Sequence, residues 1–139
     1  MAIRYVNKEV VKVYDTDFQQ VAHYAAYYRF FTDAVTNFSK EVFGDSTETL
    51  AYRGVWFVVV ESSAKYMKSA KLGDELDVEV TAELLSKKAI KYSFEIKRKG
   101  ELLTTGYLVM VCVDPEKWKA TEIPQELIDK FKIYEKSMT

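Results

Sequence analysis

The fold is decided by residues 14–44, YDTDFQQVAHYAAYYRFFTDAVTNFSKEVFG. Apolar residues recur at helical spacing from Tyr27 onward, and Gly44 supplies a stop signal. A helix of about 20 residues is roughly 30 Å long. The pattern therefore predicts one long helix that must be a main element of the core.

Two carboxylates, Asp15 and Asp17, come just before this helix. Free N–H groups and the dipole at a helix N-terminus can stabilise a developing oxyanion, and a nearby carboxylate can activate water. This combination suits acyl transfer to water. Aspartate before a helix also often only caps it or forms a turn, and for Asp15 we expect a role in shaping the loop.

The rest of the chain predicts mostly strands. Loose alternation of polar and apolar residues marks a first strand at Lys8–Tyr14, and a polar connector, Asp45–Thr49, follows the long helix. Further strands are expected at Val55–Val60, continuing bent to Lys68, at Leu76–Leu84, at Ile90–Ile96 and, after a Lys99-Gly100 hairpin, at Leu102–Val113, with a short helix after Pro124. This order indicates one α+β domain over residues 1–139.

Composition excludes several classes of protein. The 139 residues carry a net charge of -1, so no overall field recruits nucleic acid or an anionic membrane. No apolar stretch approaches the roughly 20 residues that span a bilayer, and residues 1–17 lack a signal-peptide core. We expect a cytoplasmic protein with neither nucleic-acid nor membrane partners.

The chain has one cysteine and one histidine, far apart in sequence. Cys112 lies in the apolar run Tyr107–Val113, which predicts a buried, unreactive thiol. Neither a zinc site of the usual ligand types nor a Cys-His nucleophilic pair is expected from these two residues. We expect a protein that requires no metal and no organic cofactor.

Four short motifs in this order resemble the hotdog fold, and more closely the 4-hydroxybenzoyl-CoA thioesterase family. They are Asp15-Thr16-Asp17, Tyr27-Tyr28-Arg29-Phe30-Phe31, Leu72-Gly73-Asp74-Glu75-Leu76, and Val113-Asp114 followed by Ile123-Pro124. The resemblance implies a curved antiparallel sheet wrapped around one long central helix. It also implies hydrolysis of an acyl-CoA thioester to a carboxylic acid and CoA, by a homodimer with a homotetramer as the expected full assembly.

Carried over to this chain, the resemblance makes Asp17 the catalytic carboxylate, either as nucleophile or as general base on water. The backbone N–H of Tyr24 matches the position that polarises the thioester oxygen. This chain departs from relatives at Gln20, where glycine is common, and at Tyr24 and Ala26, where many have histidine and asparagine. Its own histidine, His23, falls one place earlier and is a candidate for proton transfer; Thr32 replaces a glutamate common in the helix of relatives.

Substrate-binding candidates come from strands and basic loops. Ser62 and Ser63 lie on the strand that the resemblance places against the partner subunit's site, although hydroxyls there can also serve sheet packing. Lys65, Lys68 and Lys88 belong to basic clusters that could hold the phosphates of CoA. Such lysines are more often ordinary solvated surface.

Two other functions remain open from the sequence. A related hotdog dehydratase would act on a 3-hydroxyacyl thioester, and it would need His23 as part of its acid-base pair. A non-catalytic dimer would bind acyl-CoA without turnover. Release of free thiol, formation of an enoyl product, and tight binding without thiol release distinguish the three.

Overall fold

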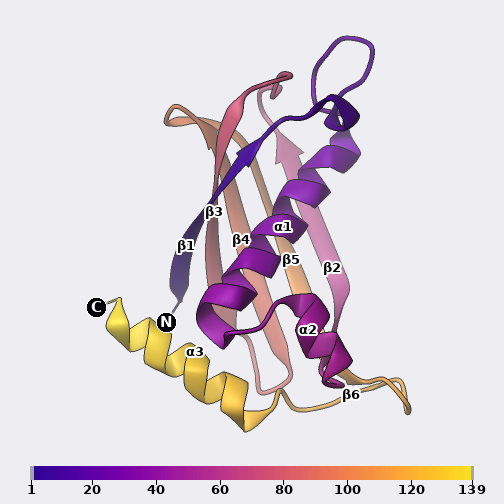
Figure 1. Cartoon of the computed structure of the whole chain (residues 1–139), viewed down its shortest axis with the longest axis vertical. Coiled ribbons are helices and arrows are strands. Elements are labelled where there is room, and N and C mark those ends of the chain that lie inside the picture. Colours follow the sequence, from indigo (N-terminus) through magenta and orange to yellow (C-terminus); the bar gives the residue numbers. More distant parts are fainter. Residues whose placement is uncertain (1, 139) are drawn as a thin grey trace.

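A computed structural model describes residues 2–138, in which an antiparallel sheet curls around one long helix (Figure 1). The strands are β1 Ile3–Val10, β2 Trp56–Tyr66, β3 Glu75–Leu84, β4 Ala89–Arg98, β5 Glu101–Asp114 and the short β6 Lys119–Ala120; the helices are α1 Tyr24–Phe43, α2 Thr47–Tyr52 and α3 Gln125–Ser137, with a 3₁₀ turn at Val13–Asp15. The sheet order is β1-β3-β4-β5-β2, and β6 pairs with β5. The α+β arrangement expected from the sequence is confirmed.

Helix α1 starts one turn earlier than the apolar pattern predicts, at Tyr24, because His23 caps it. It ends as expected at Gly44, whose φ of 82° is left-handed and favours glycine. The helix buries its apolar stripe in the concave side of the sheet, with Phe30, Phe31, Ala34 and Phe38 almost fully enclosed. The expected polar connector is partly helical, since Ser46 caps α2 by accepting from Thr49 N–H.

The predicted two-faced strands form the centre of the sheet. In β3 and β4 every second side chain enters the core: Leu76, Val78, Val80 and Ala82 on β3, and Ile90, Tyr92, Phe94 and Ile96 on β4. Phe31 of α1 stacks on Phe94, with ring centroids 4.3 Å apart. On the opposite face Glu79 is paired with Arg4 at 3.0 Å and with Lys97 at 2.9 Å. One face is thus apolar and helix-covered, the other charged.

The prediction for the first strand is wrong in its boundaries. Strand β1 runs from Ile3 to Val10, and residues 13–15 turn instead of extending the strand. Its core-facing positions include the polar Asn7, which is buried and accepts from Asn37 Nδ2 at 2.8 Å. A hydrophobic pattern could not reveal a core position occupied by asparagine.

Strand β2 forms one edge of the sheet and pairs only with β5 among the described residues. The register shifts between Val59 and Glu61, which is the bend expected in this strand. Val59 and Val60 are about half exposed along this edge. An edge of this length and composition is suited to pairing with another strand.

The expectation for the single cysteine is met. Cys112 is free and buried, as the apolar run around it indicates. Burial raises the pKa of its thiol, so the nucleophilic thiolate is disfavoured. Among residues 2–138, no helix is long and apolar enough to span a membrane.

Candidate active site

The predicted site loop, residues 16–22, folds back on itself between the 3₁₀ turn and α1. Thr16 bridges Ala22, and Asp17 N–H donates to Val21 O at 3.2 Å. Gln20 takes the left-handed conformation, with φ 63°, which is uncommon for a residue other than glycine. The loop is also tied to a second segment, because Leu72 N–H donates to Gln20 O at 3.0 Å.

The Asp17 side chain stands at the solvent-exposed turn of this loop. Its Oδ1 accepts the backbone N–H of Gln19 at 3.0 Å, an Asx turn that fixes the direction of the carboxylate. The neighbouring Phe18 is fully exposed. The carboxylate is therefore oriented by the loop and remains accessible from outside the protomer.

His23 is the N-cap of α1. Its Nδ1 accepts the N–H of Ala26 at 3.2 Å, and its Nε2 lies 3.3 Å from Tyr14 O, so the fitting tautomer carries the proton on Nε2. Both ring nitrogens are thus engaged with backbone. Within residues 2–138, therefore, no histidine has a ring nitrogen without a partner that could serve in the acid-base pair of a dehydratase.

The cap leaves other amides open. The first N–H groups of a helix have no partner inside the helix, and His23 fills only that of Ala26. Within residues 2–138, the N–H groups of Tyr24 and Ala25 have no acceptor. They are available to an anionic ligand or a developing oxyanion.

Asp15 is buried directly beneath the loop. Arg29 of α1 donates to both of its oxygens, Nε to Oδ1 at 2.7 Å and Nη2 to Oδ2 at 2.6 Å, and Lys12 N–H donates to Oδ2 at 2.9 Å. Burial alone would raise the pKa of the Asp15 carboxyl, but the hydrogen bonds from Arg29 and Lys12 outweigh it and hold the pKa below its ordinary value. Asp15 is therefore a charged group locked in place.

The other predicted residues are spread over the protomer. Ser62 lies opposite the buried Leu108 and so shares the core side of the sheet, whereas Ser63 and Lys65 lie on the other face, opposite Tyr107 and Thr105. Lys68 is paired with Glu101 at 2.7 Å, close to the α1 N-terminus.

Lys88 sits in the β3–β4 turn, at the other end of the sheet from the site loop (Figure 1). Within one protomer, then, Asp17, His23, Tyr24 and Lys68 come to one end. Ser63 and Lys65 lie on the outer face of the sheet, and Lys88 lies at its other end.

We compared three hollows of the protomer with the predicted site. One of about 280 Å³ adjoins the start of α1 and is bordered by Tyr24, Tyr66 and Lys68. Another, of about 300 Å³, is mainly apolar and lies between α2 and β2, against Trp56 and Met110.

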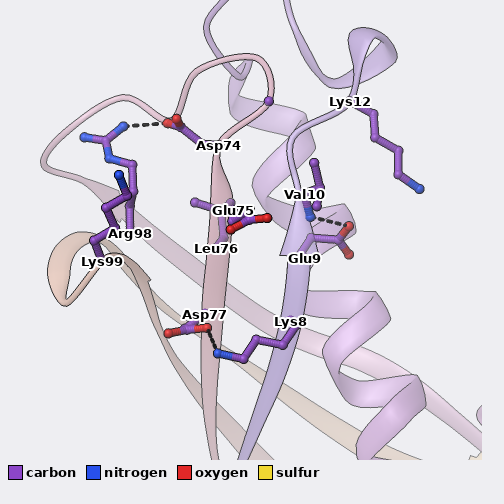
Figure 2. A pocket seen from close by; sticks show the side chains of 11 residues that line it. Lys8, Glu9, Val10, Lys12, Asp74, Glu75, Leu76, Asp77, Arg98 and Lys99 are labelled. Atoms are coloured by element: carbon purple, nitrogen blue, oxygen red, sulfur yellow. Dashed lines mark hydrogen bonds and ion pairs between the residues drawn. The ribbon is translucent and has the colours of Figure 1, made fainter.

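The largest of these three hollows, about 860 Å³, lies at the end of β1 and the start of β3, and Figure 2 shows its lining. Neither Asp17, His23 nor Tyr24 borders it. Its charges largely cancel, since Arg98 pairs with Asp74 at 2.6 Å and Lys8 pairs with Asp77 at 2.5 Å. This hollow is therefore separate from the predicted site residues.

Comparison with known proteins identifies the family. Residues 11–131 match the thioesterase-like superfamily. The chain belongs to this superfamily. The acyl-CoA thioester hydrolase YbgC of Escherichia coli is 30% identical over 127 residues, covering 88% of this chain and 92% of that protein. The acyl-CoA thioesterase YbgC of Haemophilus influenzae is 29% identical over 119 residues, covering 84% and 88%.

A solved structure agrees with the fold of this thioesterase-like chain. A 1,4-dihydroxy-2-naphthoyl-CoA thioesterase from Synechocystis superposes with a TM-score of 0.86 at 20% identity, covering 93% of this chain and 96% of that one. The fold is the hotdog fold, as the sequence motifs indicated. The protein is thus by class a thioester hydrolase, which confirms that part of the prediction.

Sequence reasoning missed one residue of the site region in this thioesterase-like protein. Arg29 carries the ion pair to Asp15, yet in sequence it reads only as part of the motif that opens the helix. A signal was present, because Arg29 is a lone cation among the aromatic residues Tyr28, Phe30 and Phe31.

No group of three or more His, Cys, Asp or Glu side chains within residues 2–138 could hold a metal ion.

Proposed function

We propose that this protein hydrolyses acyl-CoA thioesters, with Asp17 as the reacting carboxylate and the Tyr24 N–H as oxyanion donor. One observation carries the proposal: an accessible carboxylate, oriented by its own loop, immediately precedes a helix whose first two amides are unfilled. The acyl-CoA activity of the YbgC relatives supports the substrate class. The choice of Asp17 as the reacting carboxylate rests on its place in the loop before α1.

Two routes fit these groups. As general base, Asp17 would accept a proton from water while the water oxygen attacks the thioester carbonyl carbon. As nucleophile, its oxygen would attack that carbon directly and form an anhydride that water then hydrolyses. In both routes the carbonyl oxygen becomes negative next to the Tyr24 N–H, and the C–S bond breaks to release the CoA thiolate.

A second copy of the chain is part of the proposal. The edge strand β2 would pair with its equivalent in a homodimer, which would cover Val59 and Val60. Such a two-fold axis would place the Trp56 end of one β2 near the site loop of the other protomer. Residues remote from Asp17 within one chain, Ser62 and Lys88 among them, would then serve the partner's site.

His23 has a supporting role in this proposal. By occupying the Ala26 N–H with its Nδ1, it starts the helix at Tyr24 and leaves the Tyr24 amide at the end. Lys68, at the same end, would face the phosphates of CoA. We expect no metal in the reaction.

The test is a thiol-release screen over short, long and aromatic acyl-CoA substrates. Asp17→Asn should lower kcat by at least about 10², because a positioned acid-base group contributes about 10² to 10⁴. Asp129→Asn is the matched control, since Asp129 is an exposed carboxylate on α3 whose partner is Gln125. It should leave kcat unchanged.

A loss of only a few-fold in Asp17→Asn would refute the assignment of Asp17. Detection of an enoyl product from a 3-hydroxyacyl-CoA would favour a dehydratase instead. Tight acyl-CoA binding with no thiol release from any substrate would favour a non-catalytic binding protein. The same samples, run by sedimentation, would report whether the protein is a monomer, dimer or tetramer.

A further inference from the structure

Arg29 connects three parts of the fold around the site loop. Its guanidinium contacts Asp15 in the 3₁₀ turn at 2.6 Å, Glu9 at the end of β1 at 3.2 Å, and Asp33 one turn further along α1 at 2.7 Å. It also lies over the Phe30 ring, 4.8 Å from the centroid. Packing and charge together leave this side chain little freedom.

The three carboxylates are not equivalent. The Asp15 side chain is 2% exposed and receives two parallel N–H···O bonds, whereas that of Asp33 is 45% exposed and receives one. A two-bond fork fixes both distance and orientation, which a single exposed contact does not. The Asp15–Arg29 pair is therefore the rigid part of the network.

Asp15 also holds the two ends of the site loop through its backbone and side chain. Its carbonyl oxygen accepts the N–H of His23 at 2.9 Å, which fixes the residue that starts α1. Its carboxylate accepts the N–H of Lys12 at 2.9 Å, which fixes the turn that leads into the loop. Asp17 lies between these anchors, two residues after Asp15.

We infer that Asp15 and Arg29 are positioning residues, whose partly buried ion pair holds the Asp17 carboxylate and the Tyr24 amide in register for the reaction. This inference rests on the proposed function. The pair does not contact substrate; it acts through the loop and the helix start. A displacement of about 1 Å in a reacting group can cost about 10² in rate.

The expected signature is a fall in kcat with little change in KM. Neither residue of the pair borders the hollow beside Tyr24 and Lys68, where the proposed site would bind substrate. The alignment of carboxylate and amide matters only as the transition state forms. Asp15→Asn keeps the size of the side chain but turns one hydrogen-bond acceptor toward Arg29 into a donor. Arg29 keeps Glu9 and Asp33 as counter-charges in this variant, so no cation is left unpaired.

The experiment compares Asp15→Asn with Asp33→Asn, which removes a different carboxylate from the same guanidinium. We expect kcat to fall about 10- to 100-fold in Asp15→Asn, with KM within about threefold of the wild type. Asp33→Asn should keep kcat within about twofold. Assays run well below the unfolding midpoint of each variant, measured by circular dichroism, restrict the comparison to folded enzyme.

Arg29→Lys provides a second variant in case Asp15→Asn does not fold. Lysine keeps the positive charge but not the fork, so we expect a folded enzyme with the same loss in kcat. In the double variant Asp15→Asn with Arg29→Lys, the losses should not multiply, because both changes break one interaction.

Equal kcat in Asp15→Asn and Asp33→Asn would overturn the inference, as would losses that multiply. A rise in KM at constant kcat would also overturn it, by showing a binding role. If the wild type itself releases no thiol from any acyl-CoA, the proposed function has failed, and the two failures are distinguishable.

Discussion

Among the glycines of the chain, Gly106 on β5 is the one at which an added methyl group should destabilise the sheet most. A Cβ built there would lie 2.6 Å from Cζ of Phe31 and 2.6 Å from the backbone oxygen of Ser63 on β2. The ring is itself stacked on Phe94, and a backbone oxygen can move only with its strand. We expect Gly106→Ala to cost about 3 kcal/mol of unfolding free energy, the upper part of the range for overpacking.

For a chain of this length that cost lowers the melting temperature by roughly 10 °C. Thermal unfolding and urea denaturation measure it. Gly73→Ala is the matched control: it meets nothing within 4 Å but has φ +85°, so it should cost only the backbone strain, about 1 kcal/mol. If Gly106→Ala is no more destabilising than Gly73→Ala, the close packing of α1 against β5 is not as tight as these distances require.

Three further outcomes are expected. Asn37→Leu removes the side-chain partner of the buried Asn7 and should cost about 1–3 kcal/mol in urea denaturation, and adding Asn7→Val should recover part of the loss. Asp15→Asn should lower stability most near pH 7. The folded pKa of Asp15 lies below the unfolded value of about 3.9, so the wild-type advantage is full above that value and disappears as the pH falls through the folded pKa; pH-dependent unfolding that shows no such convergence would contradict the ion pair. If the chain forms the proposed homodimer, Val60→Lys places a charge on its β2 edge and should shift sedimentation from dimer toward monomer, whereas an unchanged dimer would contradict pairing through this edge.

Local pattern was sufficient for much of the fold. Strict alternation in β3 and β4 encodes one apolar and one polar face, and the Gly44 stop encodes the end of α1. These features depend on residues near in sequence, so hydrophobic periodicity and glycine stop signals reveal them. The same holds for the Lys99-Gly100 turn, whose two residues both have positive φ.

What the sequence could not reveal depends on contacts between distant segments. The end of β1 is set by its pairing with β3 and by the turn at Asp15, whose charge is satisfied by Arg29 fourteen residues later. The start of α1 is set by a histidine cap, an uncommon choice beside serine, threonine, aspartate and asparagine. The motif resemblance predicted site roles for Asp17 and Tyr24, which lie at one end of the molecule. It carried no information on the Arg29 guanidinium beneath them.

The buried Cys112 makes the chain convenient for chemical labelling. Its thiol is buried and its pKa is raised, so a maleimide should not react with it in the folded protein. A cysteine introduced at the fully exposed Phe18 would then be the one reactive thiol, at the tip of the loop that carries Asp17. A fluorophore attached there would report whether the surroundings of this loop change when substrate binds, without prior replacement of the native Cys112.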